Sequence, residues 1–582
     1  MNQNTVAVNI VGAGLAGLSA AMTFVREGVR IRLISFQPSE RAQSNLAEGG
    51  INAALNVMGE QDTIREHFLD TMKGGCELAD PNMVRNLTQA APGLVKEMDL
   101  LGVPFYREQG RMIQRNFGGQ KKKRTAYAKS STGKMLMAAL IDAVRRYEAA
   151  GLVTRYPHHR FERLVLDRGA VTGVVICDRF RKKRIRLEGA VLMACGGMNG
   201  LFAGETTGTT ANTADAQAEL LAQGIEFSNL EFLQYHPTTV SITGKRLLIS
   251  EAARGEGGRL FCYEKEPDMP EAGKTGAGGE RGRRIYFLED KYGERGNLMP
   301  RDVISREMVL LGKQVYLDLT GLSRETWAVR LSDLREEIIH YLGVDPAREY
   351  VPVSPGIHYF MGGILVDEQH RTNLSGLYAA GECACAYHGA NRLGGNSLLG
   401  AIFGGRKAAL SMMADGRLAA DGSGEAAAEG RTRVQELPEA GAVTGEGNGA
   451  QDHRTGTEGK EENQIRGKIT QILMEGMAPL RDQRTLESAL KKLDALAEAS
   501  EASACLKQTM LLARAFLLSA LARRESRGAH TRLDYPETDA DLQKNTVVSC
   551  ADGQIRISFR RIPALRPQTD GTSKSGGKED RP

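Results

Sequence analysis

The sequence has few of the residues that mark several common classes of protein. Only 5% of its 582 residues are aromatic, one of them tryptophan, and its eight cysteines show no CxxC spacing. Zinc and iron–sulfur sites need clustered cysteines, so neither kind of metal site is expected. No secretory signal is seen, and the cysteines are therefore expected to stay reduced in a cytoplasmic protein.

Long apolar runs and a strong charge of one sign are also missing. No uncharged apolar stretch reaches the roughly 18 residues that a membrane span needs, so the chain is not expected to cross a membrane. The net charge is only +5, which does not indicate a nucleic-acid partner. The basic run Lys121–Arg124 is interpreted as a solvated or partner-facing loop.

Glycine, by contrast, is abundant, and much of it falls in short motifs. The 67 glycines exceed the usual share of about 7%. Pairs such as Gly118–Gly119 and Gly196–Gly197 suit a backbone that wraps around an extended ligand. At this length, 41% hydrophobic residues are enough for two to four domains with a large core.

The N-terminal stretch predicts a strand, a tight turn, a helix and a second strand ending at Ser35. In such a unit the glycines allow the turn, the approach of a pyrophosphate and close helix packing, with the phosphate at the helix N-terminus. The predicted cofactor contacts of this turn are Gly12, Gly14, Leu15, Ala16 and Gly17.

The acid that normally ends the second strand and holds the ribose is absent. Ser35 stands there, followed by Phe36 and Gln37, which weakens a nicotinamide interpretation. A later strand, Leu377–Ala380, ends next to Glu382, whose carboxylate is placed to accept a hydrogen bond from a ribose hydroxyl. The alternative that Glu382 simply faces water stays open.

The segment Arg41–Leu55 carries small and hydroxyl residues before Gly49–Gly50, which lets the backbone lie against a flat ring system. It resembles the flavin-binding loop of the succinate dehydrogenase and fumarate reductase flavoprotein subunits. That resemblance implies FAD as cofactor, with Gln43, Ser44, Gly49 and Gly50 beside it. In the family a histidine links covalently to the flavin, and the gap-free alignment puts Gln43 at its position.

A glutamine amide is no nucleophile toward the flavin methyl carbon, so we predict that FAD is bound non-covalently. The family relationship further implies a lower flavin potential that favours fumarate reduction over succinate oxidation. Other stretches resemble the family's FAD loops, namely Thr132–Gly133, Asn212–Asp215 with Ala214 for the usual glycine, and Asn391–Leu398. They add Asp215, Ser397 and Leu398 to the cofactor contacts. A simple helix cap at Ser131 or Thr132 remains an equal alternative.

A donor, a carboxylate and a guanidinium occur within one loop system, at His236, Ser250, Glu251 and Arg254. Such a set can bind a dianion and relay a proton. The order matches the family's substrate motifs, in which His236, Ser250 and Glu251 face one end of a dicarboxylate. The resemblance assigns the other end to His358 and Arg392.

Arg301 opens a stretch that would ordinarily be interpreted as a helix start. The resemblance implies instead that it is the proton donor to the substrate carbon. A free guanidinium has a pKa above about 12 and is a poor donor unless its proton is replaced. The chain Arg301, Glu251 and Arg254 is expected to supply that replacement.

The expected fold is α/β, a Rossmann-like FAD-binding domain with an inserted α+β capping domain, a C-terminal helical domain and a small β-containing tail. The domains expected are a discontinuous FAD-binding domain (1–236 and 352–413), a capping domain (237–351), a flexible linker (414–463), a helical domain (464–536) and a C-terminal domain with a disordered tail (537–582). The stripe Met510–Leu521 is interpreted as core.

The resemblance therefore implies an FAD enzyme that interconverts fumarate and succinate. Its implied partners are fumarate or succinate, an iron–sulfur subunit and, through it, a membrane anchor and quinone, with no nucleic acid. The implied location is the cytoplasmic face of the cell membrane, peripheral through partner subunits. Two alternatives remain open from the sequence, an L-aspartate oxidase-like FAD enzyme and a non-catalytic FAD-binding subunit.

Overall fold

The computed structural model describes residues 8–129, 131–265, 282–416, 434–437 and 456–567. Its first layer is a five-stranded parallel sheet with the strand order β21-β12-β1-β2-β8. These strands are β1 (Val8–Val11), β2 (Ile31–Ser35), β8 (Val153–Pro157), β12 (Val191–Met193) and β21 (Leu377–Ala379). The predicted strand–turn–helix–strand unit is confirmed, with α1 (Leu15–Arg26) between β1 and β2.

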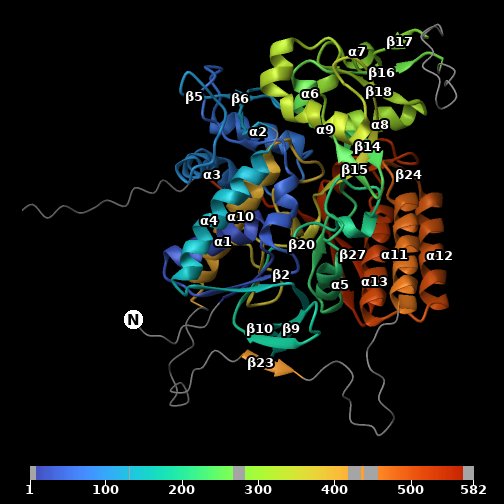
Figure 1. Ribbon diagram of the computed structural model, residues 1–582. Coiled ribbons are helices and arrows are strands. Elements are labelled where there is room, and N and C mark those ends of the chain that lie inside the picture. Colours follow the sequence, from blue (N-terminus) through green and yellow to red (C-terminus); the bar gives the residue numbers. More distant parts are fainter. Residues whose placement is uncertain (1–7, 130, 266–281, 417–433, 438–455, 568–582) are drawn as a thin grey trace, which may run out of the picture.

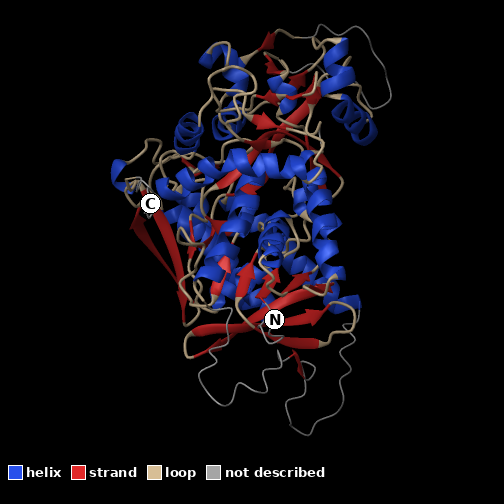
Figure 2. Ribbon diagram, turned by 90° about the vertical axis from the view of Figure 1, so that its left-hand side faces the viewer, coloured by secondary structure: helices blue, strands red, loops and turns tan. Residues whose placement is uncertain are grey.

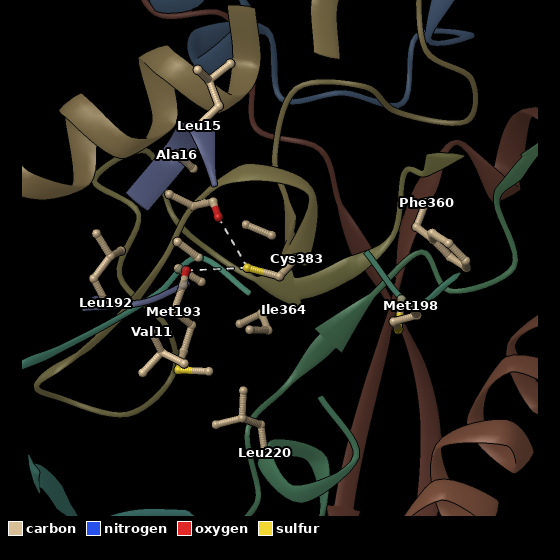
Figure 3. Close-up of a cluster of buried hydrophobic side chains, with 14 of the residues drawn as sticks. Val11, Leu15, Ala16, Leu192, Met193, Met198, Leu220, Phe360, Ile364 and Cys383 are labelled. Atoms are coloured by element: carbon tan, nitrogen blue, oxygen red, sulfur yellow. Dashed lines mark hydrogen bonds between the residues drawn. The ribbon is translucent and has the colours of Figure 1, made fainter. Parts of the chain in front are cut away.

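Helix α1 is apolar around almost its whole circumference because it lies between the sheet and α10 (Asn396–Ala414). The two helices approach so closely that a Cβ on Gly405 would lie 2.1 Å from the carbonyl oxygen of Ala16. Figure 3 shows the core beside them, where Val11, Leu192 and Met193 gather around Cys383. The Cys383 thiol donates to the carbonyl oxygens of Met193 (3.4 Å) and Ala380 (3.2 Å).

An antiparallel sheet of order β23-β11-β10-β9 adjoins the parallel one (Figure 1). Its strands are β9 (His159–Asp167), β10 (Ala170–Asp178), β11 (Arg184–Glu188) and β23 (Val434–Leu437). Strand β23 belongs to the segment for which the sequence predicts no structure, yet Val434–Leu437 pairs with β11 along its whole length. Its four residues complete an exposed edge, which local composition does not reveal. The rest of that predicted linker lies outside the described residues, except where α10 ends and α11 begins.

The capping domain has a hydrophobic core of its own, built around residues such as Leu260, Ile304, Leu317 and Trp327. Its six-stranded sheet has the order β15-β14-β19-β18-β16-β17, formed by β14 (Leu233–Ile242), β15 (Lys245–Leu248), β16 (Arg259–Tyr263), β17 (Arg284–Ile285), β18 (Val315–Asp318) and β19 (Val351–Phe360). Its helices are α6 (Ala252–Gly255), α7 (Phe287–Tyr292), α8 (Arg301–Leu311) and α9 (Ser332–Leu342), with a π-helical turn at Thr326–Arg330. The long strands β14 and β19 pair with each other and join this domain to the rest of the molecule.

Three long helices form the C-terminal layer, α11 (Gly456–Gly476), α12 (Gln483–Ala499) and α13 (Ala504–Ala522). Figure 2 shows helices occupying the middle of the molecule, with the capping domain above them and strands below. Among the described residues α13 alone is long and apolar enough to cross a membrane, with a mean hydropathy of 1.3. It is 56% buried and packs on α12 and on α5 (Asp215–Ala222), which marks it as a core helix.

The β-rich end predicted from the sequence is a hairpin in a five-stranded sheet of order β22-β20-β13-β26-β27. Its strands are β13 (Phe227–Ser228), β20 (Gly363–Leu365), β22 (Ala384–Cys385), β26 (Lys544–Ala551) and β27 (Gln554–Arg561). The disordered tail predicted beyond it lies outside the described residues. The remaining elements are the helices α2 (Ile64–Gly74), α3 (Pro81–Leu100) and α4 (Thr132–Ala149) and the short strands β3 (Ile51–Asn52), β4 (Arg107–Glu108), β5 (Arg111–Met112), β6 (Gln114–Arg115), β7 (Thr125–Ala126), β24 (Leu480–Arg481) and β25 (Thr531–Arg532). Short 3-10 turns lie at Ser39–Arg41, Gln43–Leu46, Asn199–Phe202, Gly296–Leu298, Gly381–Cys383 and Ala540–Leu542.

The last residue of the basic run Lys121–Arg124 does not fit the interpretation of this run as a solvated loop. The Arg124 side chain is fully buried and forms ion pairs with Asp62 (2.8 Å) and Asp70 (3.0 Å). Those partners come from positions more than fifty residues earlier in the chain. Arg124 is therefore a structural residue, and only the lysines of the run reach the surface.

Candidate functional site

A long cleft opens at the carboxyl ends of β1 and β2, where ligands of open α/β sheets bind. Its wall contains most of the predicted cofactor contacts, namely Gly12, Gly14, Leu15, Ala16, Ser35, Gln43, Ser44, Asp215, Glu382, Ser397 and Leu398. Gly17 does not line it. Gly17 packs against the turn instead, where a Cβ would lie 1.9 Å from the carbonyl oxygen of Gly12.

The glycine turn fits a dinucleotide. Gly12 has φ +118°, and a Cβ there would lie 2.0 Å from the carbonyl oxygen of Ala194, so the fold itself requires glycine. Gly14 differs, because a Cβ would only touch the Ser44 hydroxyl at 3.5 Å. Protein packing therefore does not demand glycine at position 14, whereas a phosphate approaching the backbone there does.

The loop with Gln43 and Ser44 lies across the start of α1, because the Ser44 hydroxyl accepts a hydrogen bond from the Leu15 backbone N–H at 3.2 Å. The Gln43 side-chain carbonyl accepts from the Thr209 backbone N–H at 2.6 Å. Beneath the loop, the Thr132 hydroxyl donates to the Glu48 carbonyl at 3.3 Å. Thr132 and Gly133 line neither cavity, so the place beside the flavin that the resemblance implied stays a prediction; the pair packs under the loop, where a Cβ on Gly133 would lie 2.0 Å from the Ser44 carbonyl oxygen. Ser131 makes no side-chain cap.

Two carboxylates stand at the edge of this cleft. Glu382 accepts a hydrogen bond from the Phe360 backbone N–H at 3.2 Å, and burial raises the pKa of its carboxyl to about 7. Glu382 therefore faces the cleft rather than open water. Asp215 forms an ion pair at 3.0 Å with Arg466 of α11, so the helical layer is tied directly to the cleft wall.

A second, smaller cavity of about 50 Å³ adjoins the cleft, and the two share Ala47, His358, Ser397 and Leu398 in their walls. It has room for a molecule of a few heavy atoms. Its wall collects the predicted substrate contacts His236, Ser250, Glu251, His358 and Arg392, together with Arg301, Gly49 and Gly50. The sequence therefore predicts which residues meet here, although they come from both domains.

Strand pairing explains how the two histidines meet. His236 lies on β14 and His358 on β19, and in the antiparallel pair His236 faces Gly356, two residues from His358. The imidazole centroids are 5.2 Å apart. Burial lowers the pKa of each ring well below its usual value, and the positive charge of Arg301 lowers it further. Both histidines are therefore neutral at neutral pH.

Arg301, Glu251 and Arg254 form one buried chain of charges. Glu251 Oε2 accepts from Arg301 Nη2 at 2.6 Å and from Nε at 3.1 Å, while Oε1 accepts from Arg254 Nη2 at 3.1 Å. Burial alone would raise the pKa of Glu251, but the two guanidinium groups outweigh it and lower the pKa. Arg301 opens α8, where the helix dipole disfavours a cation, so Glu251 supplies the compensating charge. Arg254 lines neither cavity and lies behind Glu251.

Glycines make the space that Glu251 occupies. A Cβ on Gly118 would lie 2.5 Å from Glu251 Oε1, and one on Gly394 would lie 3.1 Å from Oε2. Gly118, from a pair noted in the sequence, and Gly394 therefore flank the carboxylate, and neither lines the cofactor cleft.

Gln234 is a site residue that no sequence motif identified. It is fully buried, and its side-chain oxygen accepts from Arg301 Nη1 at 3.0 Å and from Arg392 Nη2 at 2.9 Å. Its amide group donates to Asn391 Oδ1 and to the Arg392 carbonyl, both at 2.8 Å. A neutral oxygen thus holds two like charges side by side. Burial, with Arg301 adding to it, lowers the pKa of Arg392 to about 9.

Glu48 also lines the smaller cavity and was not predicted. Its Oε2 has no hydrogen-bond partner among the described residues. Burial raises the pKa of Glu48 well above its usual range, so the neutral form is favoured. Arg301 and Arg392 line the cavity together with one charged carboxylate, Glu251, and Arg254 lies behind that carboxylate. The charged groups at and behind the wall therefore leave an excess of two positive charges. That excess complements a dicarboxylate.

Together the fold and the two joined cavities define an FAD-dependent oxidoreductase. Residues 7–398 match the family model of an FAD binding domain, and residues 498–569 match that of the fumarate reductase flavoprotein C-terminus. The chain belongs to the family of succinate dehydrogenase and fumarate reductase flavoprotein subunits. Among described residues no group of three or more histidine, cysteine or acidic side chains is placed to hold a metal ion.

The similarity to individual relatives extends over almost the whole length of both chains. The chain is 35% identical to the succinate dehydrogenase flavoprotein subunit of Bacillus subtilis, covering 94% of each chain. It is 33% identical to the fumarate reductase flavoprotein subunit of Mycobacterium tuberculosis, covering 96% of this chain and 97% of that one. A structure of Escherichia coli quinol fumarate reductase superposes with a TM-score of 0.78 at 29% identity, covering 97% of this chain and 98% of that one.

Proposed function

We propose that this protein interconverts fumarate and succinate, with FAD in the long cleft and the dicarboxylate in the adjoining cavity. The observation that carries the proposal is the buried chain Arg301–Glu251–Arg254. With Arg392 it leaves an excess of two positive charges at and behind the wall of a cavity next to the cofactor cleft. The names of the relatives support the same reaction. They do not favour the L-aspartate oxidase alternative.

When bound, FAD supplies hydride chemistry at its isoalloxazine ring. The residues that would hold it are the glycine turn and α1 N-terminus at the pyrophosphate, Glu382 at a ribose hydroxyl, and the loops with Ser44 and Ser397 at the ring. We infer that binding is non-covalent, because Gln43 carries an amide at the linking position and its oxygen is engaged by Thr209.

The protein side chains then act on the substrate. Arg392, His236, His358 and Ser250 bind the two carboxylates and polarise the double bond. Arg301 delivers a proton to one alkene carbon in the direction of fumarate reduction, and takes it back in the reverse direction. Glu251 touches Arg301 at 2.6 Å and Arg254 at 3.1 Å, so the proton that Arg301 loses is replaced along this chain.

Electrons are exchanged with a separate partner protein. We propose an iron–sulfur subunit as that partner, and through it a membrane anchor with a quinone, which places the protein at the cytoplasmic face of the membrane. The relatives support this because they are named as subunits, and one as a quinol fumarate reductase.

The test is a comparison of three assays on the purified holoenzyme. Fumarate-dependent oxidation of reduced viologen, and succinate-dependent reduction of an acceptor dye, are expected to proceed without added partner subunits. Aspartate-dependent peroxide formation without fumarate turnover would instead support the aspartate oxidase alternative. Bound FAD with none of these activities would support the alternative of a non-catalytic FAD-binding subunit.

A further inference from the structure

The residues Glu205–Thr209 lie against the substrate-binding strand β19 and have no role in the mechanism above. The backbone N–H of Thr207 donates to the Ile357 carbonyl at 2.9 Å, and that of Ile357 donates to the Glu205 carbonyl at 2.9 Å. Arg246 holds Glu205 in an ion pair of 2.7 Å. The segment therefore forms a single parallel β-bridge, between Thr206 and Ile357, beside the residue that precedes His358.

The side chain of Thr207 meets the imidazole of His358. Its hydroxyl lies 2.9 Å from His358 Nδ1, whereas the other acceptor within reach, the Ile357 carbonyl, is 3.5 Å away. The shorter contact is the better hydrogen bond. If the hydroxyl donates to Nδ1, the proton of the neutral ring is on Nε2, the nitrogen left for the cavity. An Nε2–H donates to a carboxylate, while an unprotonated Nε2 would repel one.

The other end of the segment is tied to the cofactor loop. The Thr209 backbone N–H donates to the Gln43 side-chain oxygen at 2.6 Å, so Gln43 and His358 hold the same five residues from opposite sides. We propose that Thr207 is a positioning residue of the substrate site, whose hydroxyl fixes the His358 tautomer that donates to a carboxylate, and that Gln43 anchors the segment carrying it.

This inference rests on the proposed function, because a dicarboxylate is the assumed ligand. One measurement needs no ligand. With ¹⁵N-labelled histidine, and a His358→Gln sample to assign the resonance, the spectrum of the holoenzyme is expected to show His358 protonated at Nε2. Protonation at Nδ1 would overturn the inference whatever the enzyme binds.

The second measurement is the dissociation constant of fumarate, read from the flavin absorbance of the oxidised, FAD-saturated enzyme. Thr207→Val should weaken binding about fivefold, the effect of one typical net hydrogen bond, and Thr207→Ser should restore it to within about twofold. The matched control is Thr239→Val. The Thr239 hydroxyl also donates to β19, to the Ser354 carbonyl at 2.7 Å, and its loss should leave fumarate binding unchanged.

The anchoring role of Gln43 is tested by the same measurement of the fumarate dissociation constant. Gln43→Ala should weaken fumarate binding in the otherwise wild-type enzyme but cause no further loss in the Thr207→Val background, because both changes act through one contact. Additive losses would overturn the anchoring role, and equal affinity of Thr207→Val and wild type would overturn the positioning role. Failure of the wild type itself to bind fumarate would contradict the proposed function, and the tautomer would then decide the inference alone.

Discussion

Gln234→Glu is the substitution that most sharply tests the electrostatics of the substrate cavity. Glutamate has the same shape as glutamine, but it places a negative charge between two guanidinium groups that a neutral oxygen now joins at 3.0 and 2.9 Å. Two arginines at that distance keep the new carboxyl ionised. The charged groups at and behind the cavity wall would then sum to one positive charge instead of two.

The magnitude follows from those contacts. A ligand carboxylate bound to Arg301 or Arg392 would lie about 6 Å from the new carboxylate, which costs about 2.8 kcal/mol at an effective dielectric constant of about 20. A second carboxylate, about 9 Å away, adds about 1.8 kcal/mol by the same relation. Fumarate binding should therefore weaken by about three orders of magnitude. A monoanion, which carries only the first carboxylate, should lose about twentyfold less affinity.

The assay is the titration of oxidised holoenzyme with fumarate and with monomethyl fumarate, followed by the flavin absorbance. Gln234→Met is the matched control, because it loses the same hydrogen bonds to Asn391 and Arg392 without adding a charge. Gln234→Met should weaken the binding of both ligands by a similar factor. If Gln234→Glu loses the same affinity for the dianion as for the monoanion, or binds fumarate as tightly as wild type does, the effect of charge is refuted.

Three further outcomes are expected. Acid or heat precipitation should release all flavin into the supernatant, because Gln43 cannot form the covalent link; yellow colour retained in the pellet would contradict this. Burial raises the pKa of Glu382 to about 7, and a ribose hydroxyl favours the ionised form, so FAD affinity of the apoprotein should rise between about pH 6 and about pH 8. Fluorescence titration should show this rise for wild type and a flat profile for Glu382→Gln, and a flat wild-type profile would refute the ribose contact. Ala214 has φ +67°, which costs a non-glycine residue about 1 kcal/mol. Ala214→Gly should therefore raise the midpoint of chemical unfolding, and a lower midpoint would show that the strain is absent.

Residues whose roles follow from short-range geometry could be predicted from the sequence. Gly17 is such a case, because the carbonyl that requires glycine there belongs to Gly12, five residues earlier. The positive φ of Gly12 is likewise a property of the turn, although the close contact that also excludes a side chain there is with the distant Ala194. The predicted substrate contacts also line one cavity, although His236 and His358 lie within long strands and not at element ends.

Other roles depend on partners far away in the chain and left no local signal. Gln234 joins two arginines only because β14, α8 and the loop after β22 converge. Arg124 looked solvated within a basic run, yet Asp62 and Asp70 bury it. Thr207 acts through a histidine 151 residues later, and only the pairing with β19 shows the contact.

The most direct test of the central claim is the turnover of Arg301→Lys. We expect this variant to bind FAD and fumarate but to reduce fumarate with reduced viologen about 10² to 10⁴ times more slowly than wild type, the usual contribution of a positioned proton donor. Wild-type turnover by Arg301→Lys, with FAD and fumarate bound normally, would show that Arg301 does not carry the proton.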